Sequence, residues 1–105
     1  MDTMSMAMEL IAGAGDSKSY SMEAIMQAKE GDFEKARESI SKAADALRST
    51  HDIQTTMIGD EMQGKTSEVT LLMVHAQDHL SSALLMRDLA EEFVDLYESL
   101  GKKGE

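Results

Sequence analysis

The sequence predicts an all-α protein, built as an antiparallel up-down-up three-helix bundle that occupies residues 1–105 as a single domain. Three observations support this fold class. The 105 residues contain no Pro, and they are rich in the strong helix formers Ala, Met, Leu, Glu and Lys. Apolar residues recur at spacings of three and four, which is the helical period. Two breaks that contain Gly divide the chain into three long segments joined by short turns, as in an antiparallel bundle.

The first helix is expected at about residues 3–29. Its apolar positions have helical spacing: Met4, Met8, Ile11, Met22, Ile25 and Met26. Gly13 and Gly15 weaken its middle, because each costs about 1 kcal/mol relative to Ala in a helix. These two glycines predict either a close backbone approach or a bend. Gly31 followed by Asp32 is typical of a helix end and of the N-cap of the next helix.

The second helix is expected at about residues 32–58. A heptad-like seam runs along it: Phe33, Ala36, Ile40, Ala43, Leu47, Thr50, Gln54 and Met57. Most charged residues of the segment lie off this seam, as a solvated face requires. Gly59-Asp60 and Gly64-Lys65 predict the connection to the third helix. Gln54, like Gln77 further along the chain, is able to hydrogen-bond across helices, but neither residue forms a signature by itself.

The third helix is expected at about residues 67–100, capped by Thr66 or Ser67, with residues 101–105 as a frayed tail. One side carries an ordinary core stripe: Val69, Met73, Ala76, Leu80 and Ala83. Roughly opposite lies a second, mostly apolar side: Leu71, Leu72, His75, Asp78, His79, Ser82 and Met86. A monomeric bundle would leave this second side in water, where helices normally carry charged residues, as they do on the solvated side expected over residues 87–98. It therefore predicts burial against further copies of the chain in a closed homo-oligomer.

Composition excludes several classes of function. The formal net charge of −10 argues against binding to nucleic acid or to an anionic membrane, since both require a basic surface. The absence of Cys excludes disulfides, thiol catalysis and thiolate metal sites. No apolar run reaches the roughly 18 residues of a membrane span, and the start of the chain lacks the basic character of a signal peptide. We expect a soluble cytoplasmic protein with no direct membrane insertion.

The candidate functional centre is His75-Ala76-Gln77-Asp78-His79. Asp78 is the only formally charged side chain between Val69 and Met86. Imidazoles and a carboxylate in apolar surroundings cost free energy unless they pair or perform chemistry. His75 is accordingly either a hydrogen-bonded interface residue or a ligand or catalytic group, with Asp78 and His79 one turn away on the same face. His51 is interpreted as an incidental surface or cap residue.

Two other classes of function stay open at this point. The first is a metal-binding helical bundle that uses His75, Asp78 and His79, because histidines at i and i+4 can grip one metal together. The second is a non-enzymatic coiled-coil adaptor, in which the polar centre only specifies the register of the helices.

The segment Val74-His75-Ala76-Gln77-Asp78-His79-Leu80 resembles the signature of the enzyme IIA component of the lactose/cellobiose/chitobiose class of the bacterial phosphoenolpyruvate-dependent sugar phosphotransferase system. Residues 14–19, 27–33, 50–55 and 96–98 resemble further segments of this family. Two departures stand out. Lys18 occupies a position where Arg is common, and Ser81-Ser82 follows Leu80 where Met-Thr or Met-Ser is frequent.

The resemblance implies a homotrimer and a phosphoryl carrier in sugar import. His75 would accept phosphate from the histidine phosphocarrier protein and pass it to a cysteine of the cognate IIB component. His79 and Ser82 are candidate assisting donors, because they lie within one or two turns of His75. Asp78 would lie near the trimer axis, where three carboxylates require protons or a cation such as Mg²⁺ or another divalent ion.

The resemblance also bears on what the chain would not bind. It implies no organic cofactor and no direct contact with sugar, since the sugar meets other components of the system. Ala76, where the lactose branch has Gly, is more similar to the cellobiose/chitobiose branch. Which disaccharide the system imports is left open.

Overall fold

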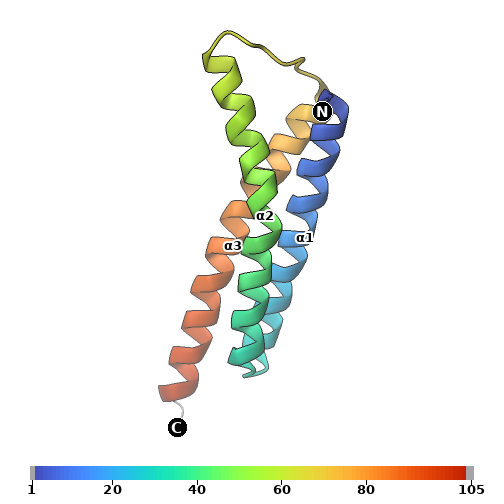
Figure 1. Cartoon of the computed structure of the whole chain (residues 1–105). Helices are drawn as coiled ribbons and strands as arrows, with labels where there is room; N and C mark the ends of the chain where they lie inside the picture. Colours follow the sequence, from blue (N-terminus) through green and yellow to red (C-terminus); the bar gives the residue numbers. More distant parts are fainter. Residues whose placement is uncertain (1, 104–105) are drawn as a thin grey trace.

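The computed structural model describes residues 2–103, which form three α-helices and no strand (Figure 1). Helix α1 spans Thr3–Lys29, α2 spans Phe33–Met62 and α3 spans Leu71–Lys103. They form a thin rod of 58 × 21 × 19 Å, in which α1 packs against both of the other helices. The start of α1 and the start of α3 lie at one end of the rod, and the end of α3 lies at the other. The predicted all-α, up-down-up three-helix arrangement is confirmed.

The rod is thin because its core is built mainly from small side chains. Nine of the buried core residues are alanines: Ala7, Ala14, Ala24, Ala28, Ala36, Ala43, Ala76, Ala83 and Ala90. Small side chains let helix backbones approach closely, so burial comes from tight packing more than from bulky residues. Larger residues such as Leu10, Leu80 and Val94 are fully buried between them. The seam predicted for α2 is confirmed, because its residues from Ala36 to Leu47 lie in this core.

Both described inter-helix connections begin with the same helix-ending motif. Gly31 after α1 and Gly64 after α2 have φ of 84° and 85°, a left-handed conformation that favours glycine. At Gly64 the N–H donates to the carbonyl of Glu61, and the next N–H, of Lys65, donates back to Asp60. These bonds satisfy carbonyl groups that the end of a helix leaves free. Asp32 then caps α2 by accepting a hydrogen bond from the N–H of Lys35 at 3.2 Å.

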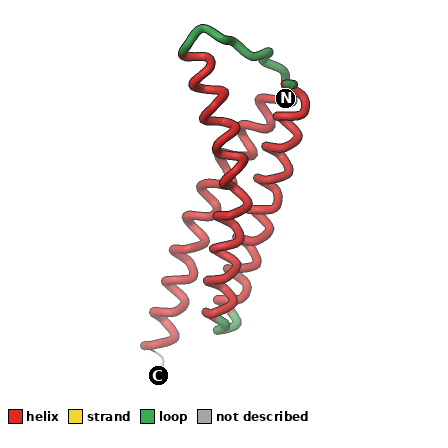
Figure 2. Tube along the Cα trace, viewed as in Figure 1, coloured by secondary structure: helices red, strands yellow, loops and turns green. Residues whose placement is uncertain are grey.

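The second connection differs from the expected one. Gly59-Asp60 does not interrupt α2, which continues through Met62, four residues beyond the expected end. Residues 65–70 form an extended loop across the end of the bundle (Figure 2), so α3 begins at Leu71 and not at residue 67. The cap is Thr70, whose Oγ1 accepts from the N–H of Met73 at 3.1 Å; neither Thr66 nor Ser67 performs this role.

The other end of α3 is also longer than expected. Residues 101–103, predicted as part of a frayed tail, continue the helix, while residues 104–105 lie outside the described residues. None of the three helices is long and apolar enough, over the part of the chain described, to cross a membrane.

Candidate functional site

The two histidines predicted as the functional centre lie side by side on α3. His75 is exposed and His79 is half-buried. Their ring centroids are 4.7 Å apart, and the rings meet edge to face at 87°. Positions i and i+4 on a helix stack above one another, so helical geometry alone brings the two imidazoles into contact. The result is one solvent-accessible imidazole supported by a more buried one.

Helix α1 contributes a third group, Lys18. Its Nζ lies 2.9 Å from Nδ1 of His79, although the two residues are 61 positions apart in sequence. Partial burial lowers the pKa of His79, and the nearby charges of Lys18 and His75 lower it further, while Asp78 opposes them. This contact was missed from the sequence, where Lys18 stood out only as a departure from the family pattern. The sequence did hold one indication that Lys18 matters, since residues 14–19 resembled a segment of the family.

The structure also describes the surroundings of the other three polar residues that were singled out from the sequence: Asp78, Ser82 and His51. Asp78 is exposed. Ser82 is exposed, and its hydroxyl donates to the main-chain carbonyl of His79 at 3.0 Å, so its proton is engaged within α3 in this structure. His51 is exposed on α2 and lines a surface pocket with Arg87 and Asp88 of α3, to which neither His75 nor His79 contributes.

The single-chain metal hypothesis finds no support in this geometry. Among residues 2–103, no three His, Cys, Asp or Glu side chains are arranged to hold a metal ion. In addition, the ammonium of Lys18 lies against Nδ1 of His79, a nitrogen that would otherwise be free to bind a metal.

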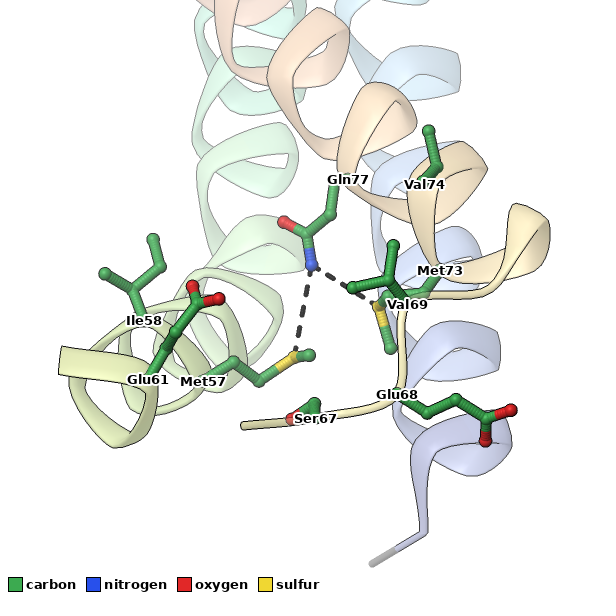
Figure 3. Close-up of a pocket in the computed structure, with 9 residues that line it drawn as sticks. All are labelled: Met57, Ile58, Glu61, Ser67, Glu68, Val69, Met73, Val74 and Gln77. Carbon is green, nitrogen blue, oxygen red and sulfur yellow. Dashed lines mark hydrogen bonds between the residues drawn. The ribbon is translucent and has the colours of Figure 1, made fainter. Parts of the chain in front are cut away.

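An apolar cavity of about 190 Å³ lies elsewhere, between the end of α2, residues 67–69 and the start of α3 (Figure 3). Gln77 points into it and donates to the sulfur atoms of Met73 at 3.4 Å and Met57 at 4.0 Å. Gln54 in turn donates to Oε1 of Gln77 at 2.8 Å, so the two glutamines hydrogen-bond to each other across helices. His75 does not line this cavity. We therefore assign this network to holding the splayed end of α2 on α3.

A second apolar face of α3 is exposed along the whole helix. It carries seven large apolar residues at spacings of three and four, interrupted by Asp78 and Ser82: Leu71, Val74, Leu85, Leu89, Phe93, Leu96 and Leu100. We call these nine residues the outward stripe. The sequence predicted an apolar second face only as far as Met86 and treated residues 87–98 as a solvated side. The prediction was wrong there, since three of the exposed apolar residues lie in that range.

Comparison with known proteins identifies the family. Residues 5–98 match the family described as PTS system, Lactose/Cellobiose specific IIA subunit. The lichenan-specific phosphotransferase enzyme IIA component of Bacillus subtilis (strain 168) is 46% identical over 88% of this chain and 84% of its own length. The chain therefore belongs to the lactose/cellobiose-specific IIA family of the bacterial sugar phosphotransferase system, whose members are phosphotransfer proteins.

Two solved structures share the fold. The cellobiose-specific enzyme IIA from Bacillus anthracis has a TM-score of 0.92 at 39% identity, covering 98% of this chain and 95% of its own. A IIA(chitobiose) chain, solved in complex with HPr, has a TM-score of 0.81 at 35% identity, covering 96% of this chain and 98% of its own. These matches confirm the family resemblance that residues 74–80 indicated.

Proposed function

We propose that this chain carries a phosphoryl group on His75, received from the phosphohistidine of a histidine phosphocarrier protein and passed to a cysteine of a cognate IIB component. The observation that carries the proposal is an exposed imidazole packed at 4.7 Å against a second imidazole, which is itself hydrogen-bonded to a lysine. A relative of this chain was solved in complex with HPr, which supports a carrier protein as the donor.

The chemistry requires little covalent work from the protein beyond positioning and charge stabilisation. A lone pair on a ring nitrogen of His75 attacks phosphorus, and the N–P bond of the donor breaks with its electron pair returning to the donor ring. The proton on the other nitrogen of each ring stays in place. In the second half, a thiolate of the IIB component attacks phosphorus, and the electron pair of the N–P bond returns to His75. His79 is the assisting donor, since the hydroxyl proton of Ser82 is engaged by a backbone carbonyl.

We further propose that the chain assembles as a homotrimer through the outward stripe. Seven exposed large apolar residues on one helix face are more than a small soluble monomer normally leaves in water. Three-fold packing of α3 would bury them and bring three copies of Asp78 together. Three clustered carboxylates need protons or a cation, and oxygen ligands suit Mg²⁺. Asp78 would then hold the ion at the axis, where it would support assembly and leave the transfer chemistry to His75.

The relatives of this chain include components specific for lichenan, cellobiose, chitobiose and lactose. We propose that the system imports a disaccharide of the cellobiose/chitobiose type or of the lactose type. Ala76, which suggested the cellobiose/chitobiose branch, is fully buried in the core. The choice of Ala at this position therefore reflects the packing of α3, because a fully buried residue cannot contact a sugar.

The test is phosphorylation of the purified chain by phosphoenolpyruvate, enzyme I and the phosphocarrier protein. We expect one acid-labile, base-stable phosphate per chain, transferable to a IIB component. His75→Gln should abolish labelling and leave the helical signal in circular dichroism intact, since the exposed ring contributes nothing to the core. His79→Ala should slow labelling about tenfold, because it removes one hydrogen bond to a charged group. The matched control His51→Gln should label at the normal rate.

The same assay separates the alternatives. Labelling that survives His75→Gln would overturn the site assignment. A chain that never becomes labelled, and that binds a transition metal through His75 and His79, would favour the metal-binding bundle. A chain that shows neither property would favour the coiled-coil adaptor. Membership of a phosphotransfer family favours the carrier over both.

A further inference from the structure

The contact between Lys18 and His79 fixes where the imidazole carries its proton. A lysine ammonium has three N–H donors and no acceptor, so Nδ1 of His79, at 2.9 Å from Nζ, must be the acceptor. A neutral imidazole has one N–H and one bare nitrogen. With Nδ1 bare and facing Lys18, the proton of the neutral His79 ring lies on Nε2.

The surroundings of His79 also oppose a second proton on its ring. Charged or titratable groups face it from both packed elements: Lys18 on α1, and His75 and Asp78 on α3. A proton on Nδ1 would point at the ammonium of Lys18 and break the hydrogen bond. The pKa of His79 is lowered accordingly, with partial burial as the first cause and the charge of Lys18 as the second.

We propose that Lys18 is a positioning residue for phosphoryl transfer: it holds His79 with its proton on Nε2, so that the ring packed against His75 presents one fixed N–H donor to the phosphoryl group. This inference rests on the proposed function of His75. The supporting observations are the hydrogen bond at 2.9 Å and the edge-to-face contact of the two rings at 4.7 Å.

The device has a clear advantage for a carrier. A free imidazole exchanges between two neutral tautomers and a cation near neutral pH, and only some of these forms present a donor on a given nitrogen. A ring that already holds its proton on Nε2 pays no free-energy cost of reorganisation when the charged phosphoryl group binds. Because Lys18 lies on α1, the correct form of His79 also depends on the packing of α1 against α3.

The direct test reads the ring of His79 by NMR. Two-bond correlations between ring ¹⁵N and ring protons distinguish the two neutral tautomers and the cation. At neutral pH, the wild-type chain should show His79 protonated on Nε2 alone, with a titration midpoint below the ordinary value of about 6.5. Lys18→Met should raise this midpoint toward the ordinary value, because it removes both the hydrogen bond and the charge.

Two further variants serve as controls. Lys18→Arg keeps a charged donor and should keep both the tautomer and the low midpoint. Lys29→Met removes one positive charge three turns further along α1, roughly 16 Å away, and should leave the ring of His79 unchanged. If Lys18→Met leaves the ring signals and the midpoint of His79 as they are in the wild type, the proposal is wrong.

The kinetic test asks whether Lys18 acts through His79. Lys18→Met should slow phosphorylation of His75 about tenfold, while Lys18→Arg should stay within about twofold of wild type. In a His79→Ala background, which leaves Lys18 no ring to position, Lys18→Met should cost no more than about a further twofold, because residues that act as one unit are not additive. A full tenfold loss in that background would show that Lys18 acts on the phosphoryl group by itself, and it would overturn the proposal.

The two failures are distinguishable. If His75 is never phosphorylated while Lys18→Met changes the ring signals and the titration midpoint of His79, the proposed function is wrong. The contact between Lys18 and His79 then has no role in phosphoryl transfer. If His75 is phosphorylated normally but neither the ring signals nor the double-variant rates respond as expected, the proposed function stands and the positioning role fails.

Discussion

Gly13 of α1 and Thr50 of α2 meet at a point where the two helices leave no room for a β-carbon. A Cβ atom at Gly13 would collide with Oγ1 of Thr50 and lie 3.1 Å from the carbonyl oxygen of Ala46. Thr50 is itself only 2% exposed, so it has little freedom to move away. Of the two explanations that the sequence left open, close approach is therefore correct for Gly13. Gly15 is not such a contact, because a Cβ atom there would meet nothing within 4 Å.

This difference predicts opposite effects for two chemically identical changes. Gly13→Ala should lower the free energy of unfolding by about 1 to 3 kcal/mol, the usual cost of overpacking a core. Gly15→Ala, its matched control on the same helix, should raise stability by up to about 1 kcal/mol, because Ala favours the helix and meets open space. Urea unfolding followed by circular dichroism measures both. Equal effects of the two substitutions would contradict the assignment of the close contact.

Local patterns predicted the helices well and their junctions less well. The motifs around Gly31 and Asp32 involve residues only a few positions apart, so the sequence contained the whole signal. The start of α3 was misplaced because Thr66, Ser67 and Thr70 are all capable caps. The choice of Thr70 depends on where the loop crosses the end of the bundle, which is a tertiary property.

The candidate site likewise combines contacts that local sequence patterns predict with contacts that depend on tertiary packing. The contact between His75 and His79 follows from helical spacing and was predictable. The contact of Lys18 with His79 joins two helices, and no period within α1 or α3 encodes it. The outward stripe beyond Met86 was missed because Leu89, Phe93 and Leu96 alternate with many charged residues. Their spacing of four and three already placed them on one helix face, and the observed exposure shows that this face is turned outward.

The outward stripe predicts a specific way to break the trimer. Leu89→Lys places a charge at an exposed position in the middle of the stripe, so the single bundle should tolerate it while the assembly should not. Light scattering should show a shift from about three chains to one, with unchanged helical content. Met62→Lys, an equally drastic change at the exposed end of α2, is the control and should leave the trimer intact. A wild-type monomer at micromolar concentration would contradict the assembly proposal outright.

Asp78 predicts a second effect on the assembly. Asp78→Leu should keep or raise the melting temperature of the trimer, because replacing clustered like charges with apolar groups is often neutral or favourable. It should also remove any stabilisation by added Mg²⁺. Asp16→Leu, at an exposed position on α1, should leave the response to Mg²⁺ unchanged. Dissociation of the trimer on Asp78→Leu would instead show that the ion or its ligands hold the three chains together.

The lowered pKa of His79 predicts how stability responds to pH. Because the folded chain holds this ring neutral beside Lys18, the unfolded chain binds more protons as the pH falls through about 6.5. Stability from this group is therefore complete above about pH 6.5 and is lost as the pH falls toward the lower pKa of the folded state. Urea unfolding at fixed chain concentration should show a smaller loss of stability on acidification through this range in His79→Gln than in wild type. His51→Gln, on an exposed part of α2, should keep the wild-type dependence. If His79→Gln also keeps it, the ring of His79 is not the group that folding holds neutral.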